Sequence, residues 1–155
     1  MAEYTKNEVQ IVQPNQPVLL NTSIACNKGY VYHRNGSGIV TLRGITPNCF
    51  ARYQVTFNGN IAIPNGGTAP AAISVALALD GEPILTSNAI VTPAAAAAAT
   101  PSNLNYFNVT STAIITVPKG CCFNVSVENT SETPTGGIAP NINVQNANLT
   151  VARIA

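Results

Sequence analysis

The chain has 155 residues, of which 46% are hydrophobic and only 8% are charged, and its formal net charge is +1. This length fits a single domain with a core of its own. The Lys and Arg residues are scattered and form no basic stripe of the kind that binds nucleic-acid phosphates. No stretch approaches the ~20 consecutive apolar residues of a membrane-spanning helix, so we expect neither nucleic acid nor membrane as a partner.

The shortage of charge points towards self-association. Typical soluble domains contain about 25% charged residues, and surface charge keeps copies of a protein apart. Here Asn, Thr, Ser and Gln supply most of the polar residues. We therefore expect part of the surface to be buried against other copies of the chain.

The N-terminal segment is polar. Residues 1–10 lack the basic start and apolar core of a secretory signal. We expect synthesis in a cytoplasm, with residues 1–15 forming an N-terminal arm and residues 16–155 forming one β-sandwich domain.

Alternation of apolar and polar residues with a period of two dominates the chain, which is typical of half-buried strands. It is clearest where Tyr53, Val55 and Phe57 share one face. About ten short strands of this kind predict an all-β antiparallel sandwich. The predicted strands are residues 9–12, 18–24, 30–33, 39–42, 52–57, 60–63, 73–79, 106–109, 113–117, 123–128 and 148–154.

Turn signals separate these strands. Asp80-Gly81, followed by Glu82-Pro83, predicts a hairpin because Asp and Gly tolerate positive φ. Residues 92–101, which enclose six alanines, and the Pro/Gly-rich residues 133–143 predict loops, since a short alanine run is marginal as a helix. Further turns are predicted at Asn35-Gly36, Asn58-Gly59, Asn65-Gly66-Gly67 and Pro118-Lys119-Gly120.

Catalytic signatures are missing from the sequence. His33 is the only histidine, and a partly exposed strand residue is its plainest interpretation. Asp80 and Glu82 could approach the spacing of a glycosidase pair, but a solvated turn explains them more simply. No phosphate-binding loop or nucleophile elbow occurs. We expect no enzyme activity, no cofactor and no metal site.

The cysteines allow several interpretations. We favour reduced, buried thiols that pack as small apolar groups. A Cys26–Cys49 disulfide, or links from the adjacent pair Cys121-Cys122, could form after release into an oxidising medium. A zinc site is disfavoured because no C-x-x-C motif occurs.

The order of several motifs resembles that of small bacteriophage and prophage structural proteins of Gram-positive bacteria. It also resembles the tumour-necrosis-factor-like jelly-roll heads of bacterial collagen-like spore-surface glycoproteins. The resemblance lies in residues 53–57 (YQVTF), 77–83 (LALDGEP) and 144–151 (VQNANLTV). It implies a trimeric jelly roll with both termini at one end, displayed on a particle surface. It also implies that Leu149, Val151 and Ile154 lie in or near the trimer core.

The favoured function is therefore a non-enzymatic virion structural protein, a homotrimeric capsid decoration or head-fibre module. We expect it on the virion surface, bound to the major capsid protein or another virion component. The N-terminal arm would serve as the capsid tether, with Tyr4, Val9 and Ile11 as its contacts.

The alternative is a carbohydrate-binding or adhesive tip of a phage fibre or bacterial surface, with a surface glycan as partner. Sugar sites favour exposed aromatic residues near amides. The loops at residues 92–101 and 133–143 could contribute. The candidate aromatic residues are Tyr30, Tyr32, Tyr53 and Tyr106.

Overall fold

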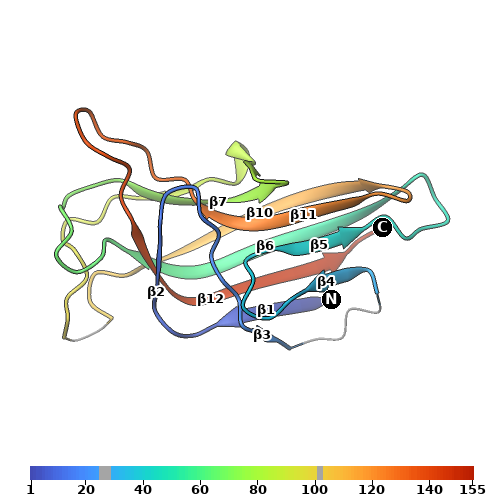
Figure 1. Cartoon of the computed structure of the whole chain (residues 1–155), viewed down its shortest axis with the longest axis horizontal. Coiled ribbons are helices and arrows are strands. Elements are labelled where there is room, and N and C mark those ends of the chain that lie inside the picture. Colours follow the sequence, from blue (N-terminus) through green and yellow to red (C-terminus); the bar gives the residue numbers. More distant parts are fainter. Residues whose placement is uncertain (25–28, 101–102) are drawn as a thin grey trace.

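In the computed structural model, which describes residues 1–24, 29–100 and 103–155, two six-stranded antiparallel sheets pack face to face (Figure 1). The first, sheet A, has the order β10-β6-β12-β1-β3, and β2 pairs with the start of β12. Its strands are β1 (Ala2–Lys6), β2 (Gln10–Val12), β3 (Thr22–Ser23), β6 (Phe50–Ala62), β10 (Phe107–Pro118) and β12 (Ile142–Arg153).

Sheet B has the order β4-β5-β11-β7-β8, with β9 also pairing with β7. One 3-10 turn, η1 (Leu85–Ser87), connects β8 to β9. The antiparallel jelly-roll sandwich predicted from the sequence is confirmed. The strands of sheet B are β4 (Val31–His33), β5 (Val40–Arg43), β7 (Ile73–Leu79), β8 (Glu82–Pro83), β9 (Ala89–Val91) and β11 (Cys122–Asn129).

The core lies between the two sheets and follows the alternation seen in the sequence. In β6, Tyr53, Val55 and Phe57 point inward and are fully buried. They meet apolar side chains of sheet B such as Val75 and Leu77, which are also fully buried. Burial of this apolar surface is the main term that holds the two sheets together.

Strand β6 is one strand where two were predicted. The sequence signal Asn58-Gly59 predicted a turn, but β6 runs through it without a break and pairs with β10 along its length. A Cβ atom at Gly59 would lie 2.7 Å from Cζ of Phe57. Glycine is therefore required here for space beside a buried ring, not for a reversal of the chain.

The N-terminal segment forms strands of sheet A where an arm was expected. Strand β1 pairs with β12, and β2 pairs with the beginning of the same strand. A bulge at Asn146, where φ is 54°, separates the two pairings. Ala2 and Tyr4 are buried because β1 alternates like the other strands. Residues 1–10 are polar on average, and this average concealed the alternation of buried and exposed side chains in β1.

The predicted hairpin and loops are present. Asp80 and Gly81 both have positive φ and connect β7 to β8, and the Asp80 carboxylate accepts the backbone N–H of Asn124 at 2.9 Å. Residues 92–100 form an irregular loop that the backbone bond from Ala97 to Ile63 ties to the body. The reversal between β10 and β11 uses Gly120, whose φ is 79°.

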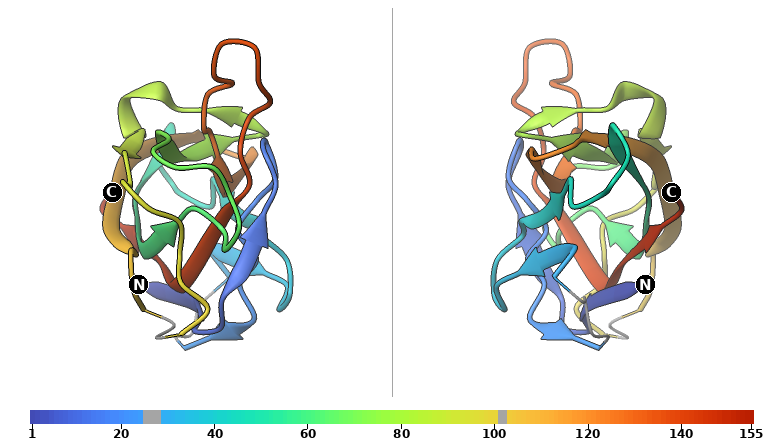
Figure 2. Two further views of the ribbon diagram at one scale, coloured as in Figure 1. Left: turned by 90° about the vertical axis from the view of Figure 1, so that its left-hand side faces the viewer. Right: turned by 90° about the vertical axis from the view of Figure 1, so that its right-hand side faces the viewer.

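Both termini lie at one end of the sandwich (Figures 1 and 2). The Ala155 carbonyl accepts the N–H of Arg52, and Met1 lies beside Val151. Residues 131–141, which we call the finger, project from the other end of the molecule. No helix in the described ranges is long and apolar enough to cross a membrane.

Candidate functional site

The outward side of sheet A carries a regular array of uncharged polar side chains. The alternation that sends Tyr53, Val55 and Phe57 into the core turns the residues between them outward. The strands on either side, β10 and β12, present the same residue types at the positions opposite. We call this array the Asn/Thr face: Thr56, Asn58, Asn60, Asn108, Thr110, Thr112, Asn148 and Thr150.

Strand register arranges these side chains in rows across the sheet. Residues opposite each other on antiparallel strands lie close enough for their side chains to interact. One row is made of threonines alone, and the neighbouring rows are made mostly of asparagines. The rows are Thr112–Thr56–Thr150, Thr110–Asn58–Asn148 and Asn108–Asn60.

Hydrogen bonds between side chains order the array. The Asn58 amide donates to Thr110 Oγ1 at 2.9 Å, and the Asn108 amide donates to Asn60 Oδ1 at 3.1 Å. The Asn60 amide in turn donates to Asn146 Oδ1 at 3.2 Å. Side chains fixed in this way lose little further entropy when a partner covers them.

An apolar margin borders the Asn/Thr face at the end that holds the termini. It consists of Phe50, Ile114 and Ile154, which are 40%, 64% and 48% exposed. The Arg52 guanidinium lies 5.1 Å from the centre of the Phe50 ring. Together the array and its margin can bury a neutral, mixed polar and apolar partner.

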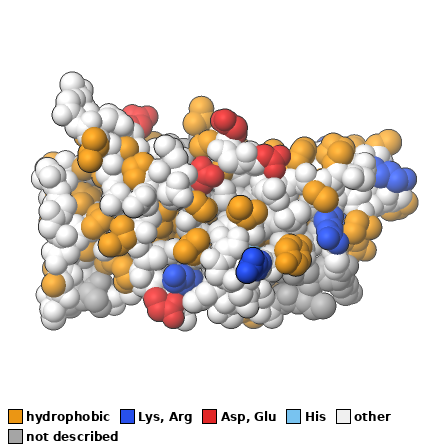
Figure 3. Space-filling view, in the orientation of Figure 1, with side chains coloured by type: hydrophobic (Ala, Val, Ile, Leu, Met, Phe, Trp, Pro, Cys, Tyr) orange, Lys and Arg blue, Asp and Glu red, His pale blue; other side chains and the backbone are white. Residues whose placement is uncertain are grey.

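Charge is sparse around the array. Glu3 lies at its edge on β1, where its carboxylate accepts the Asn148 amide, and Arg52 lies at the apolar margin. The broad side seen in Figure 3 carries Lys, Arg, Asp and Glu side chains scattered among apolar and uncharged ones. An uncharged face suits contact with protein, because burial of unpaired charge is costly.

The predicted trimer contacts divide into two groups. Leu149 and Val151 are fully buried inside the sandwich, so their side chains have no surface left for another subunit. Their apolar character reflects the intramolecular core. Ile154 has the outward orientation and belongs to the apolar margin.

The three predicted tether residues also differ in their exposure. Tyr4 is fully buried, and its ring centre lies 4.6 Å from that of His33. Val9 and Ile11 are 44% and 65% exposed. Only these two side chains are placed where a partner could reach them.

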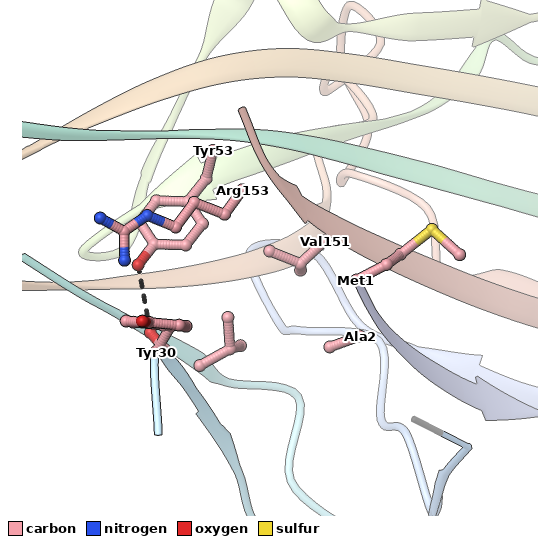
Figure 4. Close-up of a pocket in the computed structure, with 7 residues that line it drawn as sticks. Met1, Ala2, Tyr30, Tyr53, Val151 and Arg153 are labelled. Atoms are coloured by element: carbon pink, nitrogen blue, oxygen red, sulfur yellow. Dashed lines mark hydrogen bonds between the residues drawn. The ribbon is translucent and has the colours of Figure 1, made fainter. Parts of the chain in front are cut away.

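Two of the four candidate tyrosines surround a small hollow near the termini (Figure 4). The Tyr53 hydroxyl donates to the Arg43 carbonyl at 2.6 Å and lies 3.3 Å from the Tyr30 carbonyl. The Arg153 guanidinium covers the Tyr30 ring at 4.4 Å. The hollow measures about 30 Å³, which suits a water molecule better than a sugar ring.

The hydroxyl of Tyr53 is thereby held in its neutral form. Burial raises the pKa of this hydroxyl above its ordinary value, and the charge of Arg153 lowers it by a smaller amount. A raised pKa makes this tyrosine a structural hydrogen-bond donor at neutral pH.

The other two tyrosines differ in access. Tyr106 is half-buried, and its hydroxyl accepts the Asn143 amide at 3.2 Å. Tyr32 is 57% exposed on strand β4. Of the four candidates, Tyr32 has the ring most open to a ligand.

Two other polar candidates, His33 and Asp80, have structural roles, and Glu82 is exposed on β8. His33 is half-buried, and its Nε2 lies 2.9 Å from the Ser37 carbonyl. Asp80 fixes its own turn through the Asn124 N–H, as described above.

The cysteines correct one sequence-based interpretation. We expected buried thiols, but three of the four are exposed and free, and Cys26 lies outside the described residues. They lie next to turns at the end that holds the termini, where a strand end gives little cover. The exposed thiols are Cys49, Cys121 and Cys122.

The chain is an all-β jelly-roll sandwich, and the outer side of its sheet A is rich in uncharged polar side chains. No protein-family model matches the chain. No curated protein matches its sequence either.

Three solved structures resemble this chain to different degrees. The globular domain of zebrafish complement 1qA protein is 15% identical over 99% of this chain and 96% of its own, with a TM-score of 0.57. The C-terminal domain of EclA, described as a sugar-binding protein, is 16% identical over 95% of this chain and 79% of its own, with a TM-score of 0.42. CBM35 from Cellvibrio japonicus Abf62 is 15% identical over 100% and 99%, with a TM-score of 0.33. The first similarity shows a shared jelly-roll fold and nothing beyond the fold.

Proposed function

We propose that this chain is a non-enzymatic structural module that assembles as a homotrimer through the Asn/Thr face and its apolar margin. The observation that carries the proposal is this face itself, which is neutral and internally hydrogen-bonded. The apolar margin adds exposed side chains on regular strands, where they are unusual for a solvated sheet.

The energetics favour a protein partner for this face. Neutral amides and hydroxyls that are already paired lose little when they leave water, whereas charges would lose much. Phe50, Ile114 and Ile154 supply the apolar area whose burial drives association.

We further propose that the trimer is displayed on a particle surface, as a virion decoration or head-fibre module made in a bacterial cytoplasm. Support comes from the resemblance of residues 53–57, 77–83 and 144–151 to phage structural proteins, and from the termini lying at one end. Co-sedimentation with purified capsids tests this step, and a protein that never sediments with them contradicts it.

A glycan-binding role is the second candidate. It is favoured by Tyr32, whose ring is 57% exposed on the short edge strand β4. Loss of glycan-array signal in Tyr32→Ala would favour this role over the capsid role.

The assembly is tested by the native mass measured with light scattering. We expect three times the 16.1 kDa of the chain. Ile114→Glu, at the apolar margin, should give a monomer that remains folded. Its matched control is Ile90→Glu on sheet B, because Ile90 is 61% exposed and Ile114 is 64% exposed. A wild-type monomer, or a trimer that survives Ile114→Glu, would overturn the proposal.

A further inference from the structure

A groove lies at the side of the sandwich, between the edge of sheet A and the chain that follows it. It is bounded by β2 and by the segment running from Gln16 to Leu19, and its volume is about 300 Å³. The Gln10 amide bridges the two walls, because it donates to the Leu19 carbonyl at 3.0 Å and its oxygen accepts the Leu19 N–H at 2.9 Å. A volume of this size is at the lower limit of known ligand sites.

The chemistry of the groove is neutral. Ile11 and Leu19 form apolar walls and are 65% and 40% exposed. Gln13 and Gln16 are exposed and add amide groups that can donate and accept. The lining contains no charged residue and no aromatic ring on which a sugar could stack.

The finger has matching chemistry. From residue 133 to residue 141 it contains no charged residue. A turn closed by the bond from the Gly137 N–H to the Pro134 carbonyl forms its tip, and Ile138 directly after the tip is 87% exposed. This is the highest exposure among the large apolar side chains of the described residues. Figures 1 and 2 show the finger standing clear of the body of the molecule.

The base of the finger is held firmly. Asn129 donates to the Pro140 carbonyl at 2.9 Å and to the Val12 carbonyl at 3.0 Å, which ties the finger to β2. Pro134 and Pro140 restrict the chain further. A pre-ordered loop loses less entropy on binding than a flexible one.

We infer that the finger of one copy inserts into the β2 groove of a second copy, with Ile138 packed against Ile11 and Leu19. Residues 133–141 of the finger and the lining of the groove carry no charge, and the exposed side chain of Ile138 would be buried in an apolar recess lined with amides. The amides of Gln13 and Gln16 can bond to the peptide groups that flank Ile138. This contact deepens the proposed self-association, on which it rests.

The test measures association by light scattering over a dilution series. Ile138→Asp and Ile11→Asp should each weaken association at least tenfold, while the thermal melt stays unchanged because both side chains are exposed. Leu85→Asp is the matched control, since Leu85 is 79% exposed on η1. The double variant Ile138→Lys with Ile11→Glu should recover association through an ion pair. Association of Ile138→Asp at wild-type strength would refute the inference and leave the trimer standing.

A peptide of residues 131–141 separates the two proposals. It should bind the Ile138→Asp protein, whose own finger is disabled, and fail to bind Ile11→Asp. If the wild-type chain is a monomer, the trimer proposal fails, and peptide binding alone then decides the inference. If the peptide binds neither protein, the inference is refuted. If a neutral oligosaccharide displaces the bound peptide and native protein does not, the groove is a sugar site and the inference is also refuted.

Discussion

Replacement of Asn129 should disrupt the junction of both sheets and the finger. This side chain is fully buried at the end of β11. Its amide donates to the carbonyls of Val12 and Pro140, and its oxygen accepts the Ser131 N–H at 3.0 Å. In Asn129→Ala all three groups lose this partner. A buried group without a partner costs about 1–3 kcal/mol.

The three lost hydrogen bonds together give the expected loss of stability. We expect Asn129→Ala to lose about 3–5 kcal/mol of unfolding free energy, because water that enters the vacated space offsets the upper part of the sum. Against a typical total of about 5–15 kcal/mol, such a loss is large. Asn141→Ala is the control, since Asn141 is exposed in the same loop and should change stability by less than about 0.5 kcal/mol.

Asn129→Asp adds a pH signature. Ionised, the introduced carboxyl faces two carbonyl oxygens, so its pKa should be raised in the folded state. Stability relative to wild type should therefore improve as the pH falls through that raised pKa, where the neutral acid regains one O–H donor. Urea unfolding followed by circular dichroism at pH 4 and pH 7, at one protein concentration, measures both variants. A loss below about 1 kcal/mol in Asn129→Ala, or a pH-independent Asn129→Asp, would refute the reasoning.

Three further outcomes follow from the described geometry. Gly59→Ala should lower the melting temperature, because the added Cβ would meet the Phe57 ring at 2.7 Å. The same substitution should lower it by less when Phe57→Leu is already present, because the ring that it would meet is gone. Equal melting of Gly59→Ala and wild type contradicts this. Burial raises the pKa of the Glu128 carboxyl. The free energy of unfolding should therefore fall as the pH rises from about 4.3, the ordinary pKa of a glutamate, through the raised pKa of the folded state. Glu128→Gln should raise the melting temperature at pH 7 but not at pH 4. A thiol reagent should modify the folded protein rapidly at exposed cysteines, and mass spectrometry that finds any of them protected would contradict the placement. These residues are Cys49, Cys121 and Cys122.

The sandwich could be predicted from the sequence because the chain alternates strongly. The inward set of β6 and the Asp80-Gly81 hairpin follow from local rules, periodicity and positive φ, that need no knowledge of distant residues. The residues of β6 that this alternation turns outward, such as Thr56 and Asn58, carried the signal for the Asn/Thr face. That face was missed because only strand pairing aligns them with β10 and β12.

The errors share a physical cause. Leu149 and Val151 were assigned to a subunit contact, yet an apolar residue on a strand can face either the core or a partner, and local sequence does not separate the two. Asn58-Gly59 has the composition of a turn, and only the position of the Phe57 ring explains the glycine. The groove beside β2 was also beyond prediction, since its walls meet through the side chain of Gln10.

The pairing of the first and last strands has a mechanical consequence. β1 and β12 are antiparallel neighbours, and Ala2 lies opposite Val151. A force that pulls the two chain ends apart would load these ladder bonds one pair at a time, as a zipper is opened, so resistance would be low. A force applied at one end alone and opposed by contacts on the broad sheet face would load many bonds together in shear. A module of this shape should resist force when one terminus is attached and neighbouring subunits contact its broad sheet face. When both termini are attached to separate points, the same force should separate β1 from β12.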